Sequence, residues 1–289
     1  MSLELGGRAD KEGNRYEDRF FVKLVLELLL ERLVSIEVEP LGSEGTGVEF
    51  IVTAPSGERR YYQCKGSNGI NKSWRPCDLE RYSIFERAKE HILRSDKNTY
   101  YFISPVSYDE LDALCNRARS CDGSETNFIY QITNKSLRKW KDKCEVHFQT
   151  SGSELVYILS HCYFELQPAG EENKRTLEDW ISLLFVIENS HSVESIRILL
   201  ERFANDQSYW GKPICVADIV KWLEKHGIRQ RVIQQDNRCL PRIRELNQLY
   251  AERFQAIDSC MIHRTETDKL LQYILNGKSV IVLGAAGIG

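Results

Sequence analysis

The order of patterns in the first third of the chain constrains the fold most, because a long helical repeat is followed by strand-like runs. From Glu12 to Leu33, apolar residues recur at spacings of three and four, which predicts an amphipathic helix. This helix is expected to follow a loop that contains Gly6, Gly7 and Gly13. Residues 48–53 and 59–65 are β-branched and aromatic runs, and the Pro- and Gly-containing segment between them predicts a β-hairpin.

Helical and strand patterns continue to alternate after the hairpin. Helices are predicted at 78–93 and 108–119, and further strands at 36–40, 99–104, 128–133 and 145–149. We therefore expect an α/β fold over residues 1–150, with a mixed sheet flanked by helices. Residues 151–262 show mainly helical patterns, clearest at 194–203, 216–226 and 242–254, and are expected to form a helical linker domain.

Composition and charge exclude several classes of protein. With 289 residues, the chain is expected to form two or more structural units. The net charge of −3 gives no chain-wide positive field that would attract nucleic acid or a membrane. No apolar run approaches the ~18 to 20 residues that span a bilayer, and no signal-peptide pattern is present, so a cytoplasmic protein is expected. The nine cysteines include no Cys-x-x-Cys pair, which favours reduced thiols over a structural zinc site.

The last residues of the sequence carry a glycine pattern. An apolar run at 279–283 leads into a segment in which Gly284 and Gly289 match the G-x-x-x-x-G half of a nucleotide-binding P-loop. The Lys-Ser/Thr pair that contacts the phosphates and Mg²⁺ is missing, so no NTPase activity is expected from these residues alone. We expect residues 263–289 to be the start of an NTPase domain truncated within its P-loop; a flexible Gly/Ala-rich tail is the alternative.

A polar cluster in the hairpin supplies the candidate chemistry. If the hairpin turns near Ser56, paired positions sum to about 112, so Glu49 faces Gln63. Lys65 shares the face of Gln63, because side chains alternate along a strand. Glu49 and Gln63 offer oxygen ligands for a divalent cation, and Lys65 offers a positive charge, as phosphodiester hydrolysis requires. Glu17 adds a carboxylate if the long helix packs beside the hairpin. The alternative is a surface ion pair between Glu49 and Lys65, with Gln63 solvated at a strand edge.

Several short motifs around this cluster resemble a known family. They are the glycines before the long helix, Glu39-Pro40-Leu41-Gly42, Gly47-Val48-Glu49, Tyr62-Gln63-Cys64-Lys65, Trp74 with Asp78-Leu79, and Tyr101-Phe102-Ile103-Ser104. Residues 5 to about 120 resemble the N-terminal nuclease of CBASS-effector type double-stranded DNA endonucleases, a branch of the PD-(D/E)XK superfamily. Similar nucleases precede the NTPase of bacterial antiviral STAND proteins of the Avs type. The resemblance implies a restriction-endonuclease-like sheet followed by a mostly helical domain.

The function that the resemblance implies is that of a metal-dependent double-stranded DNA endonuclease, the effector module of an antiphage STAND NTPase. Oligomerisation after a phage protein is sensed would activate it. Glu49, Gln63 and Lys65 would be catalytic with assistance from Glu17, and Glu49 and Gln63 would bind Mg²⁺ or Mn²⁺. ATP with Mg²⁺ would bind only the full-length protein. The implied partners are double-stranded DNA, further copies of the chain in a tetramer, and a phage protein bound outside these residues, without a membrane.

Two further readings stay open at this point. Gln63 stands where the parent motif has Glu, and Glu49 where Asp is frequent, so the chain could be a non-catalytic DNA-binding or oligomerisation module with a degenerate nuclease fold. A restriction-like enzyme for modified DNA is the other. For DNA contact, basic residues outnumber acidic ones between 59 and 97, and Trp74 and Arg75 are candidates to touch the phosphate backbone.

Overall fold

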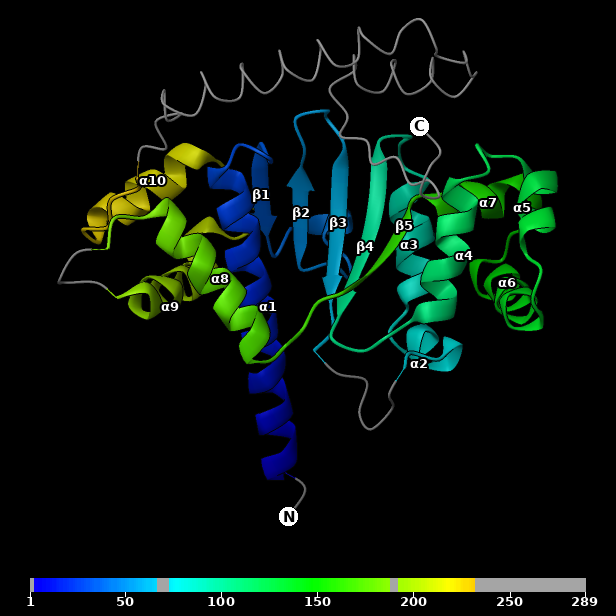
Figure 1. Ribbon diagram of the computed structural model, residues 1–289, viewed down its shortest axis with the longest axis horizontal. Helices are drawn as coiled ribbons and strands as arrows, with labels where there is room; N and C mark the ends of the chain where they lie inside the picture. Colours follow the sequence, from blue (N-terminus) through cyan, green and yellow to red (C-terminus); the bar gives the residue numbers. More distant parts are fainter. Residues whose placement is uncertain (1–2, 67–72, 188–191, 232–289) are drawn as a thin grey trace, which may run out of the picture. The chain divides into compact units, whose positions relative to one another are not determined.

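The computed structural model describes residues 3–66, 73–187 and 192–231 (Figure 1). These residues belong to one compact unit, Met1–Val232, which also contains the domain boundary expected near residue 150. The expected NTPase segment at 263–289, with Gly284 and Gly289, and the helix expected at 242–254 lie outside the described residues.

Helix α1 (Leu3–Leu29) confirms the amphipathic repeat but begins before it. Gly6, Gly7 and Gly13 lie inside this helix, so the prediction of a glycine loop is wrong. A glycine costs a helix about 1 kcal/mol relative to alanine, which does not by itself end a long helix. Further along α1, the ring of Phe20 lies 6.1 Å from that of Phe50 and 5.4 Å from that of Tyr62. The helix therefore packs directly on the hairpin.

Six strands form one mixed sheet in the order β5-β4-β3-β2-β1-β6. They are β1 (Ser35–Val38), β2 (Phe50–Thr53), β3 (Arg59–Cys64), β4 (Asn98–Ser104), β5 (Cys162–Leu166) and β6 (Pro213–Ile214). β3, β4 and β5 run parallel, whereas the other neighbours are antiparallel. The predicted mixed sheet flanked by helices is confirmed, and its restriction-endonuclease-like detail stays a prediction. Phe50 pairs with Tyr62, which is the register predicted from a turn near Ser56.

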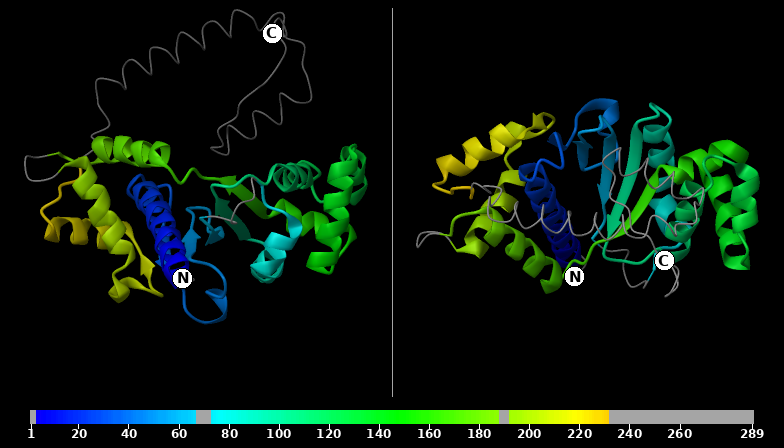
Figure 2. Two further views of the ribbon diagram at one scale, coloured as in Figure 1. Left: turned by 90° about the horizontal axis from the view of Figure 1, so that it is seen from below. Right: turned by 45° about the horizontal axis from the view of Figure 1, so that its top comes forward.

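Helices cover both faces of the sheet (Figures 1 and 2). One face carries α1, α8 (Glu171–Leu184), α9 (Val193–Ala204) and α10 (Val216–Lys225). The other carries α2 (Pro76–Arg81), α3 (Ile84–Ile92), α4 (Asp109–Arg119), α5 (Glu125–Gln131), α6 (Lys135–Phe148) and α7 (Gly152–Ser160). Phe50 and Tyr62 pack toward α1, whereas their neighbours Ile51 and Tyr61 pack on the opposite side, as the strand period of two requires. None of the helices in the described ranges is long and apolar enough to cross a membrane.

Two predicted strands are helical instead, because 128–133 falls largely within α5 and 145–149 within α6. A side-chain cap begins each helix: Ser124 and Asn134 each accept a hydrogen bond from the backbone N–H three residues further on. Of the apolar residues in these two ranges, Phe128, Ile132 and Phe148 are buried, whereas Ile129, Tyr130 and Val146 are exposed, which is not the alternation of a strand. Short apolar runs fit a strand and a buried helix equally well, and the caps decide between them here.

Two more differences concern continuity. The helix predicted at 78–93 is interrupted, since Ser83 has φ 54°, a left-handed conformation that separates α2 from α3. Residues after 150 also contribute β5 and β6 to the sheet, where mainly helical patterns are expected. β6 is only two residues long, so it carries no periodic signal.

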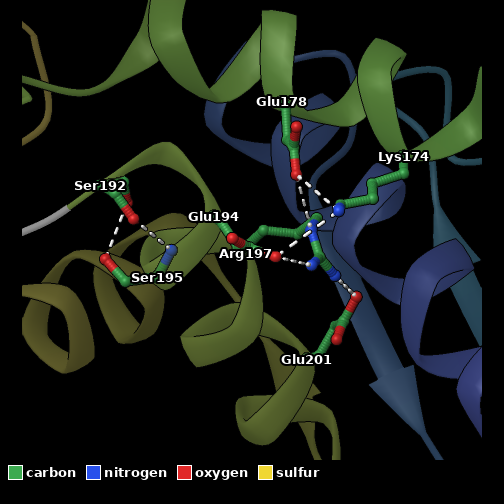
Figure 3. Close-up of polar contacts among 7 residues, drawn as sticks. All are labelled: Lys174, Glu178, Ser192, Glu194, Ser195, Arg197 and Glu201. Atoms are coloured by element: carbon green, nitrogen blue, oxygen red, sulfur yellow. Dashed lines mark hydrogen bonds and ion pairs between the residues drawn. The ribbon is translucent and has the colours of Figure 1, made fainter. Parts of the chain in front are cut away.

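An ionic cluster joins α8 to α9 (Figure 3). Arg197 is 6% exposed, and its guanidinium contacts the carboxylates of Glu178 (3.2 Å), Glu194 (3.6 Å) and Glu201. The ammonium of Lys174 lies 3.5 Å from Glu194 and 3.9 Å from Glu178. Because a buried guanidinium is costly unless it is paired, this cluster fixes the two helices against each other.

Candidate functional site

Glu49 and Lys65 lie at the same end of the β2–β3 hairpin, one just before β2 and the other just after β3. The Nζ of Lys65 is 2.9 Å from Oε1 of Glu49, and the backbone N–H of Cys64 donates to Oε2 at 2.7 Å. The side chains are 16% exposed for Glu49 and 25% for Lys65. The ion pair between Glu49 and Lys65 that was the alternative expectation is thus present. Most of it is buried, however, and both carboxylate oxygens of Glu49 accept hydrogen bonds.

Gln63 is not a solvated edge residue. It is 4% exposed on β3, an interior strand, and its Oε1 accepts a hydrogen bond from the hydroxyl of the fully buried Tyr100. An amide oxygen has two lone pairs, so one remains for a second contact. The paired residues of β2 and β3 end at Phe50 and Tyr62, and the backbone N–H of Glu49 donates to the carbonyl of Tyr62 at 2.9 Å, so Glu49 lies beside the end of β3 that carries Gln63.

Glu17 on α1 belongs to the same electrostatic neighbourhood. Burial, and then the charge of Glu49, raise the pKa of Glu17 to about 8, whereas the charge of Lys65 opposes the shift. Burial also raises the pKa of Glu49 and of Glu39, and in both cases Lys65 acts in the opposite direction. The carboxylates of Glu17, Glu39 and Glu49 are therefore all stabilised by the same ammonium.

The donor chemistry of this cluster fits a hard divalent cation, since carboxylate and amide oxygens are the ligands that Mg²⁺ and Mn²⁺ prefer. In the part of the chain that the structure describes, no three or more His, Cys, Asp or Glu side chains are grouped so as to hold a metal ion. A cation at this place would need the amide oxygen of Gln63 in addition to carboxylates.

Helix α3 braces the loop that leads to Glu49. Arg94, just after the helix, donates to the carbonyl of Ser43 at 3.1 Å. Nε2 of His91 lies 3.2 Å from the carbonyl of Thr46, and the side chain of Arg87 lies against Gly47. The spacing of 87, 91 and 94 places these residues on one stripe of the helix. The spacing of these three residues can be read from the sequence, but their contact with the loop before Glu49 cannot.

Two residues proposed to contact a nucleic-acid backbone behave differently. Trp74 is 2% exposed and its Nε1 donates to the hydroxyl of Ser104 at 2.9 Å, so it is a core residue and that prediction is wrong. Arg75 is exposed and paired with Asp78 at 3.0 Å. The indole is buried because it packs edge-on against Phe102, 5.1 Å between ring centroids.

No protein-family model matches this chain, and no curated protein does. Among solved structures, the chain is similar to the Cap4 SAVED/CARF-domain containing receptor of Moraxella osloensis, with 17% identity and a TM-score of 0.45 over 74% of this chain and 48% of that one. It is also similar to the Acinetobacter baumannii Cap4 receptor with the cyclic trinucleotide 3'3'3'-cAAA (16%, TM-score 0.44, 74% and 48%). The same receptor with 2'3'3'-cAAA gives 15% identity and a TM-score of 0.46 over 74% and 45%. The chain spans about half the length of these structures.

These neighbours correct the family inferred from the motifs. They are SAVED/CARF-domain receptors, so the identification as a CBASS-effector type PD-(D/E)XK nuclease of an Avs-type STAND protein is wrong on this comparison. The DNA endonuclease effector function that followed from it is corrected with it, and a degenerate nuclease module is not supported either. The motifs are short stretches of a few residues each, and such stretches do not by themselves establish a function.

Proposed function

We propose that Glu17, Glu49, Gln63 and Lys65 form a site that binds a divalent cation together with a phosphodiester group and hydrolyses that group. The observation that carries the proposal is the position of Lys65, whose ammonium is bonded to Glu49 while its charge also stabilises Glu17 and Glu39. Several carboxylates that depend on one ammonium in a partly buried place favour the binding of another cation.

Glu49 and the amide oxygen of Gln63 would hold the cation, Mg²⁺ or Mn²⁺. When bound, such an ion polarises a phosphoryl oxygen and lowers the pKa of a water molecule. The backbone N–H of Cys64 fixes the direction of the Glu49 carboxylate, and the hydroxyl of Tyr100 fixes the amide of Gln63. Both ligand side chains are thus oriented by neighbours that lie in or beside the sheet.

The remaining residues act on charge and protons. Hydrolysis forms a bond between a water oxygen and phosphorus and breaks the bond from phosphorus to the leaving oxygen, which takes up a proton. Lys65 offers its ammonium to the negative charge that grows on the phosphoryl oxygens. Glu17, with its pKa raised to about 8, keeps a proton on its carboxyl group near neutral pH and can donate it to the leaving oxygen.

Cation binding and hydrolysis are tested separately. Mn²⁺ titration by calorimetry is expected to show a site that Glu49→Ala removes. Glu58→Ala is the matched control, because Glu58 pairs with Arg60 near the turn of the same hairpin. Unchanged Mn²⁺ binding in Glu49→Ala would refute the site.

Hydrolysis is assayed with Mg²⁺ or Mn²⁺ on end-labelled DNA, RNA and cyclic trinucleotides. The last are included because two of the similar receptor structures contain them. Cleavage of at least one phosphodiester is expected, with a loss of 100-fold or more in Lys65→Met, an order of magnitude typical for charge stabilisation. Cation binding without cleavage of any of these substrates would reject the catalytic half of the proposal.

A further inference from the structure

Gly47 and Arg87 are in closer contact than any other residue at position 47 would permit. Gly47 has φ 74°, and a Cβ added to it would lie 2.8 Å from both Cδ and Nε of Arg87. The left-handed backbone favours glycine here, and a Cβ at this position would force the side chain of Arg87 to shift. Arg87 lies against the chain only two residues before Glu49.

The guanidinium of Arg87 is weakly paired where it lies. Its Nη1 is 3.4 Å from Oε2 of Glu90, and that carboxylate makes a shorter contact, 2.5 Å from its Oε1, with Arg94. The side chain of Arg87 is 27% exposed, so solvent and a ligand can reach it.

Helix α3, which carries Arg87, packs on the face of the sheet that carries Tyr61 and Tyr100. The hydroxyl of Tyr100 donates to Gln63, so Gln63 lies on this same side of the sheet. Gln63 and Glu49 lie at the same end of the hairpin.

We propose that Arg87 is a phosphate-binding residue of this site, whose guanidinium contacts the non-bridging oxygens of the phosphodiester held next to Glu49 and Lys65. The inference rests on the proposed function, to which it adds a second positive group for the anionic phosphodiester. A planar guanidinium can hold two phosphate oxygens at once, which the ammonium of Lys65 cannot. The packing of the Arg87 side chain against Gly47 orders the arginine before a ligand binds.

The test uses Mn²⁺ alone and a phosphorothioate-linked dinucleotide with Mn²⁺ as probes for the whole chain. Arg87→Gln is expected to weaken dinucleotide binding by about 10-fold or more, to lower its salt dependence, and to leave Mn²⁺ affinity unchanged. Arg87→Lys keeps the positive charge but not the two parallel donors of the guanidinium, so its dinucleotide affinity should lie between those of the wild-type protein and Arg87→Gln. Arg94→Gln is the matched control, because Arg94 lies on the same stripe and contacts the same loop.

Equal losses in Arg87→Gln and Arg94→Gln would overturn the inference, since the loop brace alone would then explain them. That outcome leaves Mn²⁺ binding at Glu49 intact, and so it differs from a failure of the proposed function, in which the wild-type protein binds no Mn²⁺ or Glu49→Ala binds it normally.

A second variant keeps the inference testable if Arg87→Gln folds poorly. Gly47→Ala displaces the arginine and should weaken dinucleotide binding in the wild-type background but not in Arg87→Ala. Gly57→Ala is its control, because Gly57 has φ 81° but open space, with Nζ of Lys97 as the nearest atom at 4.0 Å. If Gly47→Ala has the same effect with and without Arg87, the arginine does not bind the phosphate.

Discussion

The ammonium of Lys65 and the carboxylate of Glu49 meet at 2.9 Å, and the backbone N–H of Cys64 holds the second carboxylate oxygen. Removing one partner leaves the other partly buried without its counter-charge. We expect Glu49→Gln and Lys65→Met each to lower the free energy of unfolding by about 1–3 kcal/mol, and the double variant to lose less than the sum. Urea denaturation measures all three. Additive losses would mean that the two groups do not stabilise each other, and the Glu58–Arg60 pair of the same hairpin serves as the comparison.

Stability should depend on pH through Glu17. Its pKa rises from 4.5 to about 8 on folding, so its contribution is complete below pH 4.5 and is lost as the pH increases through about 8. We therefore expect the melting temperature to fall between pH 6.5 and 8.5, and this slope to flatten in Glu17→Gln.

Asp18 provides the control for this dependence. Burial raises its pKa to about 6, so its contribution changes at lower pH. Asp18→Asn should keep the slope between pH 6.5 and 8.5. The assignment to Glu17 fails if Asp18→Asn removes that slope and Glu17→Gln does not.

The hydroxyl of Tyr100 should matter to cation binding as well as to stability. Tyr100→Phe removes the donor to Oε1 of Gln63 and is expected to cost about 1–2 kcal/mol and to weaken Mn²⁺ binding several-fold. Tyr108→Phe is a matched control, since that buried hydroxyl donates to the carbonyl of Phe102 at 3.2 Å. It should lower stability by a similar amount without changing Mn²⁺ affinity. Equal Mn²⁺ affinities of Tyr100→Phe and Tyr108→Phe would show that the hydroxyl of Tyr100 does not contribute to cation binding.

Arg197, which is buried on α9, should be important to folding. Arg197→Met leaves three glutamates without their shared guanidinium, and we expect a loss of about 2–4 kcal/mol in urea denaturation. Arg202→Met, at an exposed position of the same helix, should change stability by less than about 0.5 kcal/mol. A small effect of Arg197→Met would show that the three glutamate carboxylates are solvated by water as favourably as they are paired with the guanidinium.

The parts of the fold that depend on local chemistry could be predicted from the sequence. The turn around Ser56 sets the register of β2 and β3, so the pairing of Phe50 with Tyr62 followed from counting alone. The long helix followed from its apolar spacing, although its first turns did not. The family inferred from the motifs was not supported, because each motif is only a few residues long.

Features that depend on distant contacts could not be predicted. Gln63 is a polar residue of a type that is usually solvated. It is buried because β4 pairs with β3 on the side opposite β2, which makes β3 an interior strand. The contact of Arg87 with Gly47 joins a helix to a loop 40 positions earlier in the chain. Trp74 was expected to contact a phosphate backbone from the loop after Lys65, but its side chain is buried against Ser104 and Phe102.

The strand order has a consequence for synthesis on the ribosome. Four strands, β1 to β4, precede residue 150, whereas the two that flank them come from 162–166 and 213–214. A nascent chain that has emerged only to residue 150 therefore carries unsatisfied backbone groups along both β1 and β4, and each can recruit a neighbouring polypeptide. Chaperone protection would be needed until Ile214 emerges and pairs with Ile36, which makes the shortest strand of the sheet the one that ends this vulnerable period.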